Sequence, residues 1–139
     1  MTQNLWVNLP VKNLDKSKAF FKQIGFKFNE QFGGNSAESA CLEIGSKPDI
    51  VMLFLDTTFQ NFSRNDIADT GRGTEVLLSF DAASKEQVDQ LATMVKAVGG
   101  DVFAAPEEID GWMYSCGFAD LDGHRWNALY MDMANMPKQ

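Results

Sequence analysis

The chain contains two copies of one pattern, and this internal repeat restricts its fold more than any other feature of the sequence. Each half has apolar residues at helical spacing, then a glycine, then short apolar runs typical of strands. Gly25 and Gly100 lie 75 residues apart, and so do Phe28 and Phe103. A half of about 65 residues buries little apolar surface alone, so we expect the two halves to fold together.

The first half is predicted to form a strand, a helix and three further strands. A strand over 5–9 is stopped by Pro10, and a helix that opens at Asn13 or Asp15 ends at Gly25. The three strands that follow are predicted at 26–28, 39–44 and 50–55. The same order of elements is then expected in the second half.

The second half repeats the order. A strand is predicted over 75–80, and Ser84 with Gln87 three residues later forms a capping-box signature for a helix that ends at Gly99 and Gly100. The remaining strands are predicted at 102–104, 112–118 and 126–131. Asp-Gly sequences mark the turns before the last two strands.

The repeat predicts one domain of the α+β class, built from two βαβββ modules that pair around a shared cleft. The modules span 1–56 and 74–132, with a polar connector over 57–73 and a tail over 133–139. A short helix is predicted near 66–69 in the connector. A ferredoxin-like sandwich with coincidental landmarks is the alternative, because identity between the halves is low.

The acidic composition argues against polyanionic partners. Twelve Lys and Arg against 19 Asp and Glu give a net charge of −7, whereas nucleic acids and anionic lipids attract basic surfaces. The N-terminal residues lack the pattern of a signal peptide, and no run of about 18 apolar residues occurs. Cys41 and Cys116 lie outside metal-binding spacings and are expected to be reduced. We therefore expect a cytoplasmic protein that binds neither nucleic acid nor membranes.

Two segments carry a resemblance to a known family. Segment 7–17, VNLPVKNLDKS, is followed by Phe20 and Phe21, and segment 118–126, FADLDGHRW, delivers the last strand through an Asp-Gly turn. With the repeat, they resemble the vicinal oxygen chelate superfamily of glyoxalases, bleomycin resistance proteins and extradiol dioxygenases. The resemblance covers nearly the whole chain. It implies the glyoxalase/bleomycin resistance/dihydroxybiphenyl dioxygenase fold and, with the exposed strand edges, a homodimer.

The resemblance points to three positions where a metal would bind. Metal-dependent members have a His on the first strand, a His or Gln opening the fifth and a Glu on the eighth; the matching residues here are Asn8, Glu75 and Asn127. One carboxylate and two neutral amides are a poor donor set for a divalent ion. We expect no cofactor and no metal-binding residues, with a weak divalent site at these three positions as the alternative. His124, the only histidine, is expected to be a turn residue.

Strand alternation indicates which side chains line the cleft. Asn8 shares a face with Trp6, and Glu75 shares a face with Leu77 and Ser79. The candidate substrate-binding residues are Trp6, Asn8, Met52, Phe54, Trp112, Tyr114 and Asn127. Core packing is the alternative for the aromatic and Met residues, and a hydrogen-bonded structural cluster is the alternative for the two Asn with Glu75.

Two functions fit these residues. In the first, the cleft is a metal-free pocket that binds a small, partly aromatic or amide-bearing molecule without chemistry. In the second, Glu75 is the catalytic residue of a lactoylglutathione-lyase-like lyase or isomerase, in which an apolar pocket makes its carboxylate a general base on a carbon acid. Only the neutral amides of Asn8 and Asn127 could then stabilise the oxyanion, so the first function is preferred.

Overall fold

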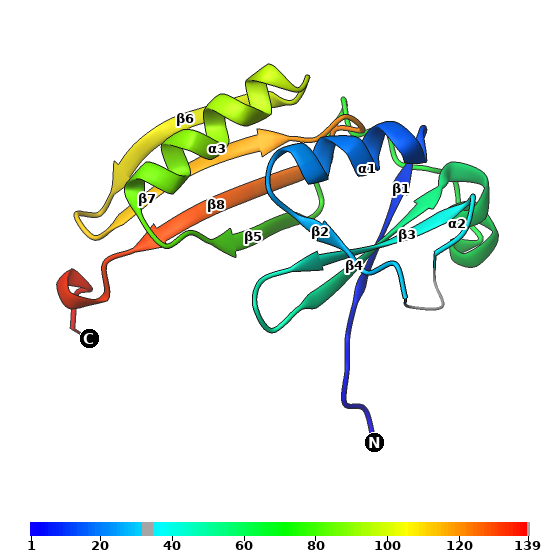
Figure 1. The fold of residues 1–139 in the computed structure, drawn as a ribbon, viewed down its shortest axis with the longest axis horizontal. Helices are drawn as coiled ribbons and strands as arrows, with labels where there is room; N and C mark the ends of the chain where they lie inside the picture. The colour runs from blue at the N-terminus through cyan, green and yellow to red at the C-terminus, as the bar shows by residue number, and fades with distance from the viewer. Residues whose placement is uncertain (32–34, 139) are drawn as a thin grey trace. The chain divides into compact units, whose positions relative to one another are not determined.

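The computed structural model describes residues 1–31 and 35–138. It divides into two compact units, Met1–Arg72 and Gly73–Gln139. Each unit contains a four-stranded sheet with a helix on one face (Figure 1). The α+β class and the repeated βαβββ order are confirmed, whereas the shared cleft stays a prediction.

The first unit has the predicted elements and one more helix. They are β1 (Val7–Val11), α1 (Leu14–Gln23), β2 (Lys27–Phe28), β3 (Ser39–Ile44), β4 (Asp49–Leu55) and α2 (Asp56–Ser63). Asn13 caps α1 by accepting a 3.0 Å hydrogen bond from the Lys16 N–H. After α1 the chain turns through Gly25, whose φ of 104° favours glycine. Both limits of the predicted helix are confirmed.

Two predictions for this unit are wrong. Pro10 lies inside β1 rather than ending it. Because β1 is an edge strand beside β4, its outer side tolerates a residue without an N–H. The connector helix forms directly after β4, as α2, and not near 66–69. Packing favours this position, since the Phe62 ring of α2 lies 5.3 Å from the Phe54 ring of β4 between centroids.

The second unit follows the same order, with a short final turn of helix. Its elements are β5 (Leu77–Asp81), α3 (Lys85–Ala97), β6 (Asp101–Ile109), β7 (Met113–Ala119), β8 (Arg125–Met131) and η1 (Met133–Asn135). The capping box is confirmed: Ser84 accepts a 3.2 Å hydrogen bond from the Gln87 N–H, and the Gln87 side chain accepts one from the Ala83 N–H at 2.9 Å.

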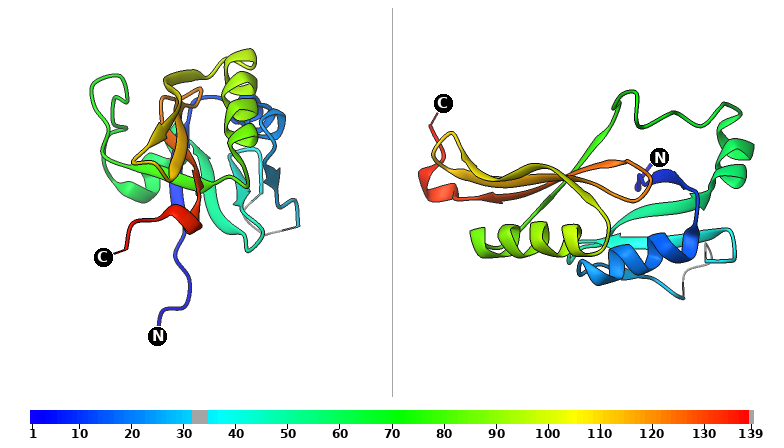
Figure 2. Two further views of the ribbon diagram at one scale, coloured as in Figure 1. Left: turned by 90° about the vertical axis from the view of Figure 1, so that its left-hand side faces the viewer. Right: turned by 90° about the horizontal axis from the view of Figure 1, so that it is seen from above.

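The core of the second unit lies between α3 and its sheet (Figure 2). Val88, Leu91 and Val95 are buried on α3. The sheet contributes aromatic rings, of which Phe118 and Trp126 are stacked with centroids 6.3 Å apart. Burial of these large apolar side chains fixes which face of the sheet the helix covers.

Two strands of this unit differ in length from the prediction. The fifth strand starts at Leu77, so Glu75 precedes it. The sixth runs over Asp101–Ile109 instead of 102–104. It ends in a hairpin turn at Asp110 and Gly111, whose φ values of 56° and 77° match the left-handed positions of a type I′ turn.

The two sheets have the same topology. The strand order is β1-β4-β3-β2 in one and β5-β8-β7-β6 in the other, with a parallel pair β1–β4 or β5–β8 and antiparallel pairs elsewhere. The first and last strands of each module are therefore neighbours, which brings residues from both ends of the module side by side. Among the described helices, none is long and apolar enough to cross a membrane.

Candidate functional site

Each sheet has one face packed against its module's helix, and the other face carries half of the predicted site residues. On β8, Trp126 and Ala128 are buried, whereas Arg125 and Asn127 are only partly buried and lie on the opposite side. We call the side away from α1 in the first unit, and from α3 in the second, the open face of that sheet.

The open face of the first sheet brings three predicted residues together. Asn8 of β1 is in register with Met52 of β4, and Phe54 follows two residues later on the same side. Met52 is buried and Asn8 is exposed. Trp6 lies just before β1 and is 55% exposed. The pairing of β1 with β4 therefore places the candidates Asn8, Met52 and Phe54 on one face of the sheet.

On the open face of the second sheet, Asn127 lies at the centre of a row of small residues. It is in register with Ser79 of β5 and with Gly117 of β7. Its side-chain amide donates a 3.4 Å hydrogen bond to Ser79 Oγ. The row therefore presents amide and hydroxyl groups where a bulky side chain would otherwise fill the space.

Beside this row, Phe103 of β6 lies flat over Gly117 and under Arg125. A Cβ built at Gly117 would lie 2.5 Å from Phe103 Cε1, so only glycine leaves room for the ring. The Arg125 guanidinium lies 4.1 Å from the centroid of the same ring, within cation–π distance. This pair was not predicted from the sequence, and its one local signal is a glycine in the middle of a strand.

Two of the candidate substrate-binding residues do not join this face. Tyr114 lies on the α3 side, where its hydroxyl donates a 2.6 Å hydrogen bond to Asp89 Oδ1. That bond is the main cause that raises the pKa of Tyr114. Trp112 lies in the turn before β7, where its carbonyl accepts a 2.7 Å hydrogen bond from the Asp132 N–H. Neither side chain can be grouped with Asn127 by strand alternation.

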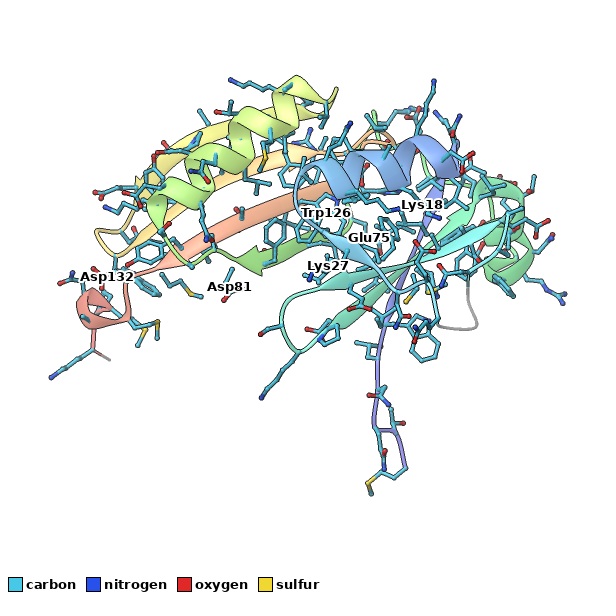
Figure 3. The ribbon with its side chains drawn as sticks, viewed as in Figure 1. Lys18, Lys27, Glu75, Asp81, Trp126 and Asp132 are labelled. Atoms are coloured by element: carbon cyan, nitrogen blue, oxygen red, sulfur yellow. The ribbon has the colours of Figure 1, made fainter. Side chains whose placement is uncertain are left out.

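Glu75 is placed differently from the prediction. It lies in a bend before β5 and is exposed, and Figure 3 labels its position. Within its own unit it has no hydrogen bond or ion pair to the described residues. A carboxylate in this setting is solvated, so the apolar surroundings that the general-base hypothesis requires are not provided by its own module.

The three matched positions do not fit a divalent metal. They offer one carboxylate oxygen donor group, at Glu75, and two neutral amides, and Asn127 already donates to Ser79. In the described part of the chain no three His, Cys, Asp or Glu side chains gather closely enough to hold an ion.

The turn before β8 is held by a buried carboxylate. Asp120 Oδ1 accepts 3.0 Å hydrogen bonds from the N–H groups of Asp122 and His124, and Oδ2 accepts one from the Trp126 indole N–H at 3.0 Å. Burial raises the pKa of the Asp120 carboxyl, against the His124 charge and these donors, which lower it. His124 lies in this turn, as predicted, and Asp120 has a structural role.

Comparisons with known proteins cover nearly the whole chain. A family model described as bleomycin resistance protein-like N-terminal matches residues 3–45. A hypothetical protein of known structure from S. aureus is 36% identical, with a TM-score of 0.82 over 94% of this chain and 95% of that one. No curated protein matches the sequence.

More distant structures share the fold. A glyoxalase/bleomycin resistance protein/dioxygenase family enzyme from Burkholderia phytofirmans is 21% identical, with a TM-score of 0.76 over 91% of this chain and 96% of that one. A lactoylglutathione lyase from Agrobacterium tumefaciens is 18% identical, with a TM-score of 0.65 over 98% of each chain.

Proposed function

This chain belongs to the vicinal oxygen chelate superfamily, the glyoxalase, bleomycin resistance protein and dioxygenase group, and on that premise we propose that it binds a small organic molecule without a metal-dependent reaction. The observation that carries the proposal is the open face of the second sheet. There an aromatic ring, a guanidinium and an Asn amide lie around a row of small residues. Such a mixture of apolar surface with a few polar groups is typical of ligand sites.

The donor set supports binding rather than metal chemistry. Where metal-dependent relatives carry His and Glu, this chain carries Asn8 and Asn127. An amide can hydrogen-bond a ligand amide or hydroxyl, but it adds no negative charge to hold a divalent ion. We propose that the Asn127 side chain contacts the ligand on the open face of the second sheet. Asn8, Met52 and Phe54 lie on the corresponding face of the first sheet.

A lyase or isomerase of the glyoxalase type is the alternative function. It would need Glu75 as a general base or as a weak metal ligand. The exposure of Glu75 favours neither role. The lactoylglutathione lyase of similar structure supports the shared fold at 18% identity and not a shared reaction.

The test is a binding experiment with neutral probes. We would titrate ¹⁵N-labelled protein with benzamide and follow the amide signals of Ser79, Gly117 and Asn127. Saturable shifts confined to the open face, weakened in Asn127→Ala and unchanged in Asn65→Ala, are expected. Asn65 is the control because it is an exposed Asn outside both sheets. No saturable shift with benzamide or a panel of similar neutral aromatic amides would contradict the proposal.

A thermal-shift titration separates the enzyme alternative. Chelator-treated protein and the Glu75→Ala variant would be heated with Mn²⁺, Co²⁺, Ni²⁺, Zn²⁺ and Mg²⁺. Because an ion that binds the folded state raises Tm by mass action, a saturable rise that the variant loses would favour the lyase. For each of the two proteins, we expect the Tm with each ion to equal the Tm without it, within error.

We further propose that the protein works as a homodimer in the cytoplasm. The support is the family fold together with unpaired strand edges, which favour association with a second copy. Light scattering on the purified chain measures the mass directly. A mass near 15.5 kDa, that of one chain, would contradict the dimer.

A further inference from the structure

We propose that the open face of the second sheet binds the carboxylate of a small, singly charged ligand, and that the Arg125 guanidinium is its anchor. The inference rests on the proposed function and narrows it, because it names the chemical class of the molecule. It also assigns a ligand contact to a residue that none of the family's three metal positions includes.

The first support is that Arg125 has no acidic partner among the described residues of its own unit. The ion pairs of the described residues join Lys22 with Glu30 and Lys85 with Glu108, and none includes Arg125. Yet the chain has seven more acidic than basic residues. A half-buried guanidinium that stays unpaired in such a chain keeps its full capacity to bind an anion.

The second support is that the Arg125 guanidinium lies over an aromatic ring. Its guanidinium lies 4.1 Å from the Phe103 ring centroid, and Phe103 itself is seated on Gly117. A cation–π contact does not use the guanidinium N–H groups as hydrogen-bond donors to the ring's neighbours, so these groups stay available. These groups match a carboxylate, which accepts two parallel hydrogen bonds from them. A site held in place before binding loses little entropy when the ligand arrives.

The third support is the row next to Arg125, which is polar but uncharged. Ser79, Gly117 and Asn127 lie one row along the sheet on the same face. Their amide and hydroxyl groups can hydrogen-bond the neutral part of a ligand. The Phe103 ring offers apolar contact beside them. The arrangement therefore fits an organic acid better than an inorganic ion.

The charge of the ligand is limited by the acids around this row. Asp81 is in register with Leu129, Glu107 with Ser115, and Asp101 with Ala119, so all three lie on the open face. Figure 3 shows Asp81 on the side of β5 away from α3. One guanidinium balances one negative charge, and these carboxylates repel a second. A carboxylate is therefore favoured over a dianionic phosphate monoester.

The experiment uses benzoate as the probe and benzamide as its neutral counterpart. Both are titrated into ¹⁵N-labelled protein at constant ionic strength, with sodium chloride replacing benzoate in the blank. The Arg125 Nε–H and the Asn127 side-chain signals report the site. We expect saturable shifts with benzoate and a dissociation constant at least about tenfold lower than for benzamide.

Two variants and one control localise the charge effect. Arg125→Gln should weaken benzoate at least about tenfold and leave benzamide unchanged, because only the charged hydrogen bonds are lost. Arg125→Lys keeps the positive charge but lacks the planar guanidinium. Its affinity for benzoate should therefore lie between those of the wild type and Arg125→Gln. Arg72→Gln removes the same charge from an exposed loop and should bind benzoate like the wild type. Unchanged α3 amide signals show that each variant is folded.

The outcomes separate this inference from the proposed function. Equal affinity of Arg125→Gln and wild type for benzoate, equal affinity of benzoate and benzamide, or no saturable benzoate shift would each overturn the carboxylate anchor. Saturable benzamide binding at Asn127 would still support the small-molecule proposal in any of these cases. Loss of benzamide binding as well would overturn both.

Discussion

The indole N–H of Trp126 donates a 3.0 Å hydrogen bond to the carboxylate of Asp120, six residues earlier, at the turn before the last strand. Trp126 is 1% exposed and Asp120 is 7% exposed, so this bond joins the turn to the core of the second unit. The other carboxylate oxygen accepts two backbone N–H groups. Asp120 therefore positions β8, and with it Arg125 and Asn127.

Replacing Asp120 by Asn should destabilise the protein. An amide can accept from the backbone N–H groups or from the indole, but its NH₂ group would then face a donor on the other side. One buried N–H is left without an acceptor, which costs about 1–3 kcal/mol of the free energy of unfolding. Urea unfolding followed by Trp fluorescence measures this cost, and Asp120→Ala should lose more.

Asp49→Asn is the matched control for that experiment. Asp49 is an exposed carboxylate at the start of β4, so the substitution should change the free energy of unfolding by less than about 0.5 kcal/mol. Equal stability of Asp120→Asn and wild type would show that the indole bond contributes nothing.

Gly117→Ala tests the seat of the Phe103 ring. The new Cβ would lie 2.5 Å from Phe103 Cε1, so the ring must move and its contact with Arg125 weakens. Overpacking of this kind costs about 1–3 kcal/mol. Removing the ring removes the clash, so Gly117→Ala should cost almost nothing in a Phe103→Ala background. If Gly117→Ala lowered the free energy of unfolding equally in the wild type and in Phe103→Ala, its effect would not come from a clash with the Phe103 ring.

Tyr114→Phe should lower stability at neutral pH and lose this effect in alkali. The hydrogen bond to Asp89 raises the pKa of Tyr114 above its usual 10.0, so the folded state holds the phenol proton more tightly than the unfolded state. The stabilisation is complete below pH 10 and disappears as the pH rises through the raised pKa. Urea unfolding at pH 8 and pH 11 measures the difference between variant and wild type.

The control for Tyr114 is Tyr130→Phe. Tyr130 lies opposite Tyr114 in the register of β7 and β8, and the bond to Asp89 comes from Tyr114. The difference in the free energy of unfolding between Tyr130→Phe and the wild type should not become smaller from pH 8 to pH 11 as it does for Tyr114→Phe. A constant difference for Tyr114→Phe across that range would contradict the proposed cause.

Elements with local signals could be predicted from the sequence. Helix α3 has a capping box at Ser84 and a glycine exit at Gly99, and the third strand was predicted at its observed limits. Helix α2 has no side-chain cap and no buried residue, so periodicity did not reveal it. Its aromatic contact with the sheet is Phe62 against Phe54, which no local pattern encodes.

In the candidate site too, some residues could be predicted from local patterns and others could not. Alternation within single strands selected Asn8, Met52 and Phe54 as separate candidates, and the pairing of β1 with β4 brings them to one face. It misplaced Tyr114, because that prediction needed the register of β7 relative to α3. Arg125 and Phe103 come from strands that are not neighbours, so their stacking follows from sheet order and from Gly117 between them.

Both cysteines should be unreactive in the native protein, which gives the last prediction. They are free and buried. Burial, and then the charge of Asp89, raises the pKa of the Cys116 thiol to about 11, and burial with Glu43 raises that of Cys41. Because the thiolate is the nucleophile, reaction with DTNB at pH 8 should be at least about a hundredfold slower than in urea. Unfolding should release both thiols, and Cys41→Ser and Cys116→Ser each release one. A fast native phase that disappears in Cys116→Ser would show that α3 opens from its sheet, since Cys116 Sγ lies against the Val88 carbonyl of that helix.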